Sequence, residues 1–305
     1  MIPVFTIVHH HPDPVSTFQA VVLGLLQGVT ELFPISSLGH TVLFPTLFGW
    51  HTLVKSQSQP ESFWLAFVVM LHVGSAVGLL IYFWRDWVEI IKAFFATLGK
   101  RRIETSTERL AWLIIFATIP TGIIGLVAEH AARTATAKPE VASVFLIVNG
   151  FMLLGAEALR RRTLAREREA LAGGPVRTRD IDSLEPKDGV VLGLGQSLGL
   201  IAGMSRDGAV MATGLVRGLD NASAARLSFL FATPVILAAG IFKVGDLTGP
   251  NGNGLRGEAF IAAGVAAVVA VFTVHFLTRY FKRSSLIPFG IYCALFGVAM
   301  TIYNA

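Results

Sequence analysis

The N-terminal region contains the stretch Gln27-Gly28-Val29-Thr30-Glu31-Leu32-Phe33-Pro34-Ile35-Ser36-Ser37-Leu38-Gly39-His40 inside otherwise apolar sequence. Hydrocarbon does not tolerate such a run of polar side chains unless they pair with one another or with a ligand. Gln27 and Glu31 are four residues apart, so they share one face of a helix, and Pro34 ends that helix. Ser36 or Ser37 can then cap a second helix, whose free N–H groups and dipole would receive an anion.

A second stretch has the same character. Gln196 and Ser197 precede Gly203-Met204-Ser205-Arg206-Asp207-Gly208, which is a polar, glycine-flanked break inside apolar sequence. The guanidinium of Arg206 would fit phosphate oxygens bidentately. Two broken apolar segments at matching positions in the two halves of the chain indicate an internal repeat around a site at the membrane midplane.

Composition indicates an integral membrane protein. The 305 residues are 53% hydrophobic and 15% charged, whereas soluble domains carry roughly 25% charged residues. The mean hydropathy is +0.63. The formal net charge of +5 does not indicate nucleic-acid binding, because the cations cluster between the apolar segments and report topology. The single cysteine, Cys293, excludes a disulfide within the chain.

Apolar runs near the spanning length predict six transmembrane helices, at 63–84, 110–129, 141–160, 226–245, 257–278 and 286–303. Shorter runs around the two polar breaks predict two re-entrant helical hairpins, formed by 17–33 with 41–50 and by 189–204 with 208–219. The order of one hairpin and three spans occurs twice. Because the number of spans in each half is odd, the halves would be inverted in the membrane.

The predicted fold is therefore an all-α integral membrane protein with an inverted-topology repeat, six spanning helices and two re-entrant helical hairpins. Residues 1–305 form a single membrane domain. Within it we expect a first inverted repeat over 17–160, a charged cytoplasmic connector over 161–187 and a second inverted repeat over 188–303.

The charge of the connecting segments alternates. Seventeen Lys and Arg residues lie in 85–109, 160–187 and 279–285, whereas four lie in 1–16, 51–61, 130–140 and 246–256. This positive-inside pattern predicts that the N- and C-termini are outside. The first hairpin then enters from outside and the second from the cytoplasm, with tips that could meet within the membrane.

Ionisable residues inside a membrane are functional candidates, and here they are Glu31, His40, Arg206 and Asp207. Arginine, hydroxyls and helix N-termini make an anion site. Glu31 and Gln27 offer oxygens to a hard divalent cation such as Mg²⁺ or Ca²⁺. His40 lies three residues after Ser37, within reach to activate that hydroxyl or to attack phosphorus itself. These parts suit phosphoryl transfer.

Structural interpretations of the same residues remain open. Ser36 and Ser37 can be helix caps, His40 can be a packing histidine, and Glu31 and Arg206 can be an ion pair that joins the two tips.

Three more polar groups lie in the predicted spans. His72 is expected near a membrane interface or helix end. Asn149 and Glu157 are expected along the interior of the bundle.

These stretches closely resemble the bacitracin-resistance family of undecaprenyl-diphosphate phosphatases. Residues 27–31 are similar to its Glu/Gln-x-x-x-Glu motif, and residues 34–40 to its Pro-x-Ser-Ser-Thr-Gly-His motif. Residues 202–210 are similar to Pro-Gly-x-Ser-Arg-Ser-Gly-x-Thr. Supporting similarities include Leu71-His72-Val73-Gly74, Ala117-Thr118-Ile119-Pro120 and Leu227-Ser228-Phe229-Leu230.

The resemblance implies a multi-pass protein of the bacterial plasma membrane. It would hydrolyse polyprenyl (undecaprenyl) diphosphate to polyprenyl phosphate and phosphate, recycling the lipid carrier of cell-wall synthesis. The active site would face the extracytoplasmic side, with a divalent cation, Mg²⁺ or Ca²⁺, as cofactor. The expected partners are the polyprenyl diphosphate lipid and the membrane, without nucleic acid, and a homodimer is left open.

The resemblance also implies roles for individual residues. Ser37 or His40 would be nucleophile and general base, in either order, and Glu31 would serve metal binding or proton transfer. The residues expected to bind the diphosphate are Arg206, Ser205, Ser36, Gly203 and Gly208. Those expected to bind the metal are Glu31, Gln27 and, as a further candidate, Asp207.

Four positions depart from the family motifs, with Leu38 and Val210 in place of Thr, Ala202 in place of Pro and Asp207 in place of Ser. The lost hydroxyls favour binding over chemistry, so the alternative function is a transporter or flippase of polyprenyl phosphate or another anionic lipid. A third hypothesis is an inactive relative that binds partners through 160–187.

Overall fold

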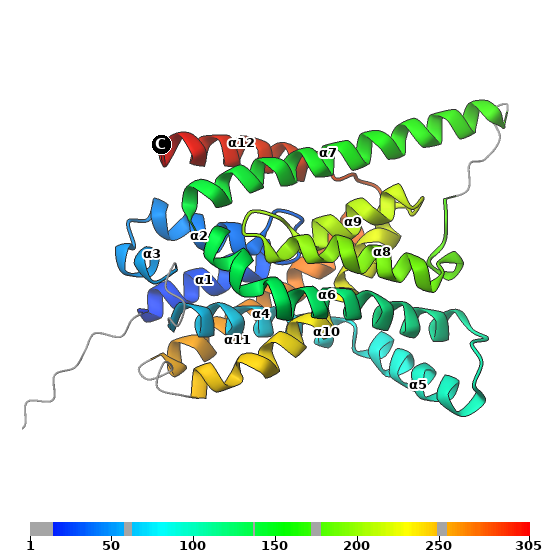
Figure 1. The fold of residues 1–305 in the computed structure, drawn as a ribbon, viewed down its shortest axis with the longest axis horizontal. Helices are drawn as coiled ribbons and strands as arrows, with labels where there is room; N and C mark the ends of the chain where they lie inside the picture. Colours follow the sequence, from blue (N-terminus) through cyan, green and yellow to red (C-terminus); the bar gives the residue numbers. More distant parts are fainter. Residues whose placement is uncertain (1–14, 58–62, 137, 172–177, 249–254) are drawn as a thin grey trace, which may run out of the picture.

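A computed structural model describes residues 15–57, 63–136, 138–171, 178–248 and 255–305 of the chain (Figure 1). Within these ranges the protein is helical and contains no strand. A single isolated β-bridge pairs Arg179 with Leu219. Five helices are long and apolar enough to cross a membrane, namely α4 (Phe63–Tyr82), α6 (Ser106–Thr136), α7 (Pro139–Ala170), α10 (Asn221–Thr248) and α11 (Arg256–Tyr280). The predicted all-α class with several membrane-capable helices is thus confirmed for the described residues.

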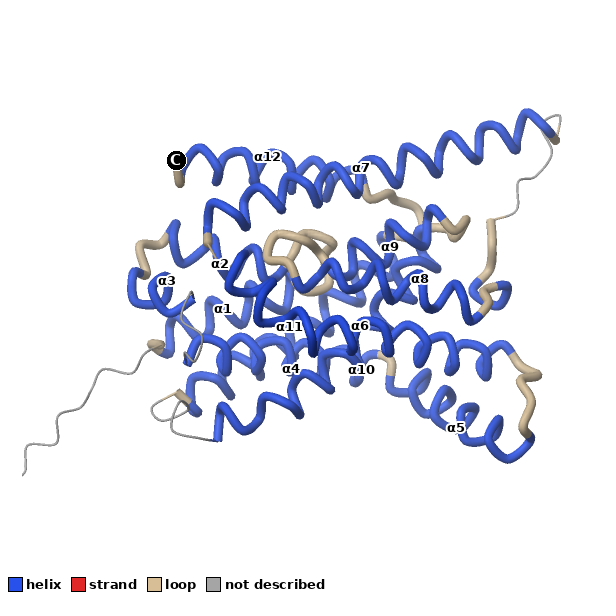
Figure 2. Tube along the Cα trace, viewed as in Figure 1, coloured by secondary structure: helices blue, strands red, loops and turns tan. Residues whose placement is uncertain are grey.

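Shorter helices form two hairpins. The first consists of α1 (Thr17–Thr30) and α2 (Ser37–Leu47), and the second of α8 (Pro186–Gln196), the 3₁₀ helix η2 (Ser197–Leu200) and α9 (Arg206–Val216). The first hairpin lies toward the end of the bundle that holds the C-terminus and the second toward the opposite end (Figure 1). Loop segments lie in the middle of the bundle (Figure 2). A Cβ atom on Gly39 would be 3.0 Å from Cα of Gly203, so the two tips touch there.

Serine caps begin the helices at the two tips. The hydroxyl of Ser36 accepts the backbone N–H of Gly39 at 3.1 Å, and the hydroxyl of Ser205 accepts that of Gly208 at 2.9 Å. These bonds satisfy N–H groups that have no partner within the helix. Because Ser36 supplies this cap, α2 begins at Ser37, four residues before the start predicted from hydropathy.

The first helix of each hairpin packs closely on a longer helix. A Cβ on Gly24 of α1 would lie 2.6 Å from the carbonyl oxygen of Ala262 in α11. A Cβ on Gly189 of α8 would lie 2.9 Å from the carbonyl oxygen of Leu113 in α6. Such backbone approaches need a residue without a side chain, and they are a common way of joining helices in membranes. The glycines therefore hold both hairpins against the bundle.

One part of the sequence interpretation was wrong. Residues 85–109 were expected to be a loop, but α5 (Trp84–Lys100) is a helix. Its exposed apolar residues recur every three or four positions, at Trp84, Val88, Ile91, Phe95 and Leu98. This amphipathic pattern is typical of a helix that lies along a membrane interface. The helix as a whole is too polar to cross a membrane.

The remaining elements are short. They are α3 (His51–Gln57), the 3₁₀ helix η1 (Ile181–Ser183) and α12 (Ile287–Tyr303), which has 17 residues and packs along α7.

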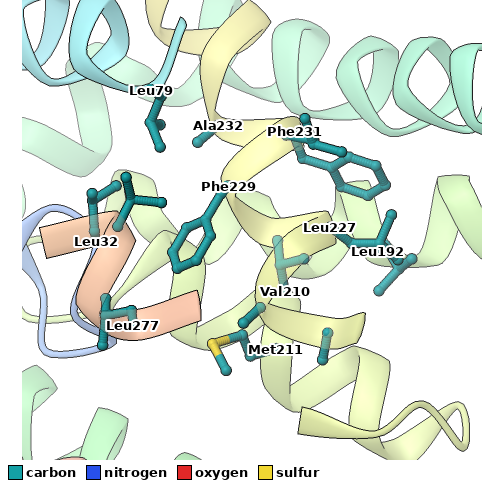
Figure 3. Close-up of a cluster of buried hydrophobic side chains, with 14 of the residues drawn as sticks. Leu32, Leu79, Leu192, Val210, Met211, Leu227, Phe229, Phe231, Ala232 and Leu277 are labelled. Carbon is teal, nitrogen blue, oxygen red and sulfur yellow. The ribbon is translucent and has the colours of Figure 1, made fainter. Parts of the chain in front are cut away.

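A hydrophobic core lies around α10, which packs on α4, α6, α9 and α11. Figure 3 shows Phe229 and Phe231 of α10 among Leu79, Val210 and other buried apolar side chains. Many large apolar side chains face outward as well, including Leu126 and Val127, which are 72% and 81% exposed. An exposed apolar surface of this kind suits a protein surrounded by lipid.

Candidate active site

The carboxylate of Glu31 is the point at which the two hairpins meet. Glu31 follows the last residue of α1 and is 6% exposed. Its Oε2 accepts hydrogen bonds from Nε2 of Gln27 at 3.0 Å and from Oγ of Ser37. Its Oε1 accepts a hydrogen bond from Nη2 of Arg206. A buried charge persists only when it is paired and hydrogen-bonded, and these three donors meet that need.

Arg206 opens α9 and reaches across to the first hairpin. Besides its bond to Glu31, it donates from Nη1 to the carbonyl oxygen of Ala232 at 3.2 Å. Its Nε lies 3.6 Å from Oδ1 of Asp207. Each Nη carries two hydrogens, so the guanidinium keeps donors for a ligand after making these bonds. Its side chain is 13% exposed and lines a cavity.

His72 on α4 completes the cluster. Its Nδ1 donates to the carbonyl oxygen of Val68 at 2.7 Å, because a carbonyl can only accept. Its Nε2 is 3.3 Å from Oε2 of Glu31 and 3.5 Å from Oγ of Ser37. Because Nδ1 is held by the carbonyl of Val68, Nε2 is the ring nitrogen that faces both the carboxylate of Glu31 and the hydroxyl of Ser37.

Sequence reasoning missed His72 as a site residue, because it expected an interface or helix-end position. The similarity of Leu71-His72-Val73-Gly74 to a family motif was the signal that could have found it.

Asn149 on α7 joins the two hairpin tips. Its Oδ1 accepts the backbone N–H of Ser205 at 3.0 Å, and its Nδ2 donates to the carbonyl oxygen of Pro34 at 3.0 Å. Asn149 is fully buried. One side-chain amide therefore fixes the backbone of both tips relative to each other. The sequence suggested only that this residue lines the bundle interior.

His40 faces away from the cavity. Its Nδ1 is 2.7 Å from the carbonyl oxygen of Ser36, and its Nε2 is 2.8 Å from the hydroxyl of Tyr292. Its ring stacks with those of Tyr292 and Phe296. The structure thus brings Glu31, Ser37 and Arg206 together, and it holds His40 behind the turn at Ser36.

The other residues expected to bind the diphosphate lie in the tips themselves. Ser36 has φ 72°. The hydroxyls of Ser36 and Ser205 both act as helix caps. Gly203 has φ +99°, and a Cβ there would meet Phe145 and the backbone of Ala142 in α7. Gly208 offers its N–H to Ser205. These residues shape the two turns. The glycines allow backbone conformations and close approaches there that a side chain would prevent.

The expected metal ligands Gln27, Glu31 and Asp207 lie at or beside the ion pair of Glu31 with Arg206. Among the described residues no group of three or more His, Cys, Asp or Glu side chains could hold a metal ion. Both oxygens of Glu31 already accept hydrogen bonds. Oε1 of Gln27 and both carboxylate oxygens of Asp207 are buried without a hydrogen-bond partner. These three oxygens are acceptors that the protein itself leaves without a hydrogen-bond partner.

A cavity of about 330 Å³ opens onto the cluster. Its polar floor includes Glu31, Ser37, His72 and Arg206. Its walls are apolar and come from α4, α6 and α10, with Trp64, Val68, Leu126, Val235, Ile236 and Phe242 among them. A cavity with a few polar groups at one end of an apolar channel suits an amphipathic ligand with a charged head and a hydrocarbon tail.

Comparison with known proteins gives the family. Residues 20–299 match the family described as Bacitracin resistance protein BacA. The chain is 46% identical to undecaprenyl-diphosphatase 2 of Frankia alni, covering 93% of this chain and 96% of that protein. It is 46% identical to undecaprenyl-diphosphatase of Mycolicibacterium paratuberculosis, covering 95% and 98%. It is 39% identical to undecaprenyl-diphosphatase 2 of Chromobacterium violaceum, covering 95% and 99%. The chain belongs to the bacitracin resistance protein BacA family.

Proposed function

We propose that this protein hydrolyses undecaprenyl diphosphate to undecaprenyl phosphate and inorganic phosphate, and so recycles the lipid carrier of cell-wall synthesis. The observation that carries the proposal is a single cavity in which Ser37, Glu31 and Arg206 meet beneath apolar walls. The polyprenyl chain would lie along α4, α6 and α10, and its diphosphate would reach the polar floor. The names of the relatives support the same reaction.

In the proposed mechanism Oγ of Ser37 attacks the terminal phosphorus. The hydroxyl proton passes to Glu31, whose Oε2 already accepts it as a hydrogen bond. The bond from that phosphorus to the bridging oxygen breaks, and undecaprenyl phosphate leaves with the electron pair. Water then attacks the phosphorus of the phosphoserine, and the bond from phosphorus to Oγ breaks with its electron pair on Oγ. The proton held by Glu31 returns to that oxygen, and inorganic phosphate is released. Arg206 stabilises the charge that develops on the transferred phosphoryl group.

Two histidines take different parts in this proposal. His72 faces Ser37 and Glu31, so we propose that it accepts the proton of the attacking water in the second step. His40 has both ring nitrogens occupied behind the turn, so we assign to it the positioning of Ser36 and the start of α2. Ser37 is therefore the nucleophile that this arrangement favours over His40.

A divalent cation, Mg²⁺ or Ca²⁺, is proposed from the resemblance alone. When bound it would offset the charge of the diphosphate. Magnesium ions are usually held by substrate phosphates and water with only one or two protein carboxylates. Such a site would need only one or two of the expected ligands Glu31, Gln27 and Asp207 from the protein.

The internal repeat is also part of the proposal. In each hairpin a glutamine near the end of the first helix precedes the capping serine by nine positions, as Gln27 does for Ser36 and Gln196 for Ser205. In each, that serine accepts the N–H of a glycine three residues later. This correspondence supports two inverted repeats over 17–160 and 188–303, with α12 as the sixth span.

The proposed orientation places the active site outside. The cavity residues Trp64, Leu126 and Phe242 lie near the ends of α4, α6 and α10 that adjoin the Lys/Arg-poor segments. The positive-inside rule assigns those ends, and both termini, to the extracytoplasmic side. A homodimer remains a prediction of the sequence.

The deciding experiment measures phosphate release from C55 polyprenyl diphosphate by the purified protein in detergent, with and without Mg²⁺ or Ca²⁺. Turnover that disappears in Arg206→Ala supports the hydrolase. If folded protein gives no turnover with either metal but moves polyprenyl phosphate across vesicles, the transporter replaces the proposal. Circular dichroism and thermal unfolding show whether each sample is folded.

A further inference from the structure

A second cavity lies at the opposite end of the helices from the active-site cavity. It has a volume of about 610 Å³ and is lined by residues 157–161 of α7, the start of α10, the turn after α11 and the start of α12. Helix α10 contributes Asn221 to this cavity and Phe242 to the other. At 1.5 Å per residue those two positions are roughly 30 Å apart.

The lining carries more positive than negative charge. Arg160 and Arg161 come from α7, and Lys282 and Arg283 come from the turn after α11. The acidic residues that face them are Glu157 and Asp220. Glu157 pairs through Oε1 with Nε of Arg161 at 3.1 Å and with Nη1 of Arg160 at 3.4 Å. The surplus of cations favours an anionic occupant over a neutral or zwitterionic one.

Three buried polar atoms of the lining have no hydrogen-bond partner within the protein. They are Oε2 of Glu157, Oδ1 of Asn221 and Nε of Arg160. Glu157 is 1% and Asn221 7% exposed. Unpaired buried polar atoms are costly and are normally satisfied by a ligand or ordered water. An occupant that satisfies them needs an acceptor for Nε of Arg160 and donors for the two oxygens.

From this pattern we propose that the cavity binds a hydroxyl-bearing phosphate ester, such as the glycerol-phosphate headgroup of an acidic phospholipid. The phosphate oxygens accept from Nε of Arg160 and from the cations of the rim. The hydroxyls donate to Oε2 of Glu157 and Oδ1 of Asn221. The positive-inside pattern places this end of the helices at the cytoplasmic headgroup layer, where such lipids are available.

The test is native mass spectrometry of the purified protein titrated with defined lipids. Phosphatidylglycerol should bind at least about tenfold more tightly than phosphatidylethanolamine of the same chains, because of the net charge of the cavity. It should also bind more tightly than phosphatidic acid, which is anionic but lacks the terminal glycerol and its two hydroxyls. Tighter binding of phosphatidic acid, or equal binding of phosphatidylethanolamine, would overturn the proposal.

Variants locate the binding. Arg160→Gln should weaken phosphatidylglycerol binding about tenfold, as expected for one charge-assisted hydrogen bond. Arg283→Gln, an exposed residue of the rim, is a second variant that does not disturb buried packing. The matched control is Arg166→Gln, an exposed arginine of α7 that is not part of the lining. Equal losses in Arg166→Gln and the two cavity variants would mean general attraction to basic residues, which contradicts the proposal.

Competition with a soluble phosphate ester shows whether the ligand is a lipid or a soluble molecule. If glycerol 3-phosphate displaces phosphatidylglycerol at a comparable concentration, the site takes a soluble phosphate ester of the same chemistry. If it does not, the lipid headgroup is the occupant. Phosphate release from polyprenyl diphosphate should remain unchanged in Arg160→Gln, because the two cavities are separate.

Discussion

Arg206 donates a hydrogen bond from Nη2 to Oε1 of Glu31, which lies 175 positions earlier in the chain. The bond joins the tip of the second hairpin to the end of the first helix of the first hairpin. The ion pair holds the two tips together, and the same guanidinium faces the cavity. The structural role of the pair and the catalytic role of Arg206 can be tested separately.

A charge exchange separates structure from catalysis at this pair. In Glu31→Arg with Arg206→Glu, the ion pair can re-form, so thermal stability should recover relative to either single variant. Phosphate release should stay at least about 100-fold below wild type, because each charge would then lie on the wrong side of Ser37. Thermal unfolding and phosphate release are measured on all four proteins. Full recovery of activity in the double variant would show that the pair is only structural.

The roles of the hydroxyl and the two histidines predict an order of damage. Ser37→Ala should lower kcat by more than about 10⁴-fold, because it removes the proposed nucleophile. His72→Gln should lower kcat by about 10²–10⁴-fold and flatten its pH profile, with little change in thermal stability. His40→Gln should mainly lower the unfolding temperature, since its contacts are to Ser36 and Tyr292.

Burst kinetics and the pH profile of each variant check this order. The assignment fails if His72→Gln retains wild-type kcat across the pH range while His40→Gln is fully folded and inactive.

Asn149 should be required for the relative position of the two tips. Asn149→Leu leaves the buried N–H of Ser205 without a partner, at a cost of about 1–3 kcal/mol. It also leaves the carbonyl of Pro34 with only the weak thiol donor of Cys293 at 4.0 Å. Asn149→Asp keeps the acceptor for Ser205 but buries a carboxylate oxygen against the carbonyl of Pro34, so it should be destabilised as well. Chemical unfolding in detergent gives the free energies. Equal stability of wild type and Asn149→Leu would mean that the amide does not hold the tips.

The apolar walls predict selectivity for long lipid tails. Gly125 lines the cavity, and a Cβ there would meet nothing within 4 Å, so Gly125→Leu should fold and narrow the channel. We expect a rise in KM of about tenfold for C55 diphosphate and little change for a short, C15 polyprenyl diphosphate. Gly264→Leu is the control, because Gly264 also has open space but is not part of the cavity. Equal effects on both chain lengths would place the tail elsewhere.

Asp207 should oppose substrate binding. Its carboxylate is buried, has no hydrogen-bond partner and lies beside Arg206. In Asp207→Ser, the residue typical of the family motif, a negative charge near the diphosphate is removed. KM should fall, by roughly up to tenfold, with kcat retained. Asp207→Asn tests charge alone at nearly constant volume. A higher KM in both variants would instead indicate that the carboxylate assists binding, for example through a cation.

The sequence by itself determined the class of the protein and the two stretches that matter. Runs of apolar residues near the spanning length can only be satisfied as helices in lipid, because backbone polar groups must pair internally there. Polar residues within such runs are exceptional, so Gln27 to His40 and Gly203 to Gly208 could be selected without a structure. An ion pair between Glu31 and Arg206 is one structure that these polar stretches predict.

Only the tertiary structure decided which side chains face one another. The ring of His40 has the right spacing from Ser37, but its direction depends on Ser36 and on Tyr292, which lies 252 positions away. His72 and Asn149 come from helices distant in sequence, and only the packing of α4 and α7 against the tips brings them to Ser37 and Ser205. Helical periodicity fixes neighbours within one helix, whereas contacts between helices depend on how their backbones pack, which no single segment encodes.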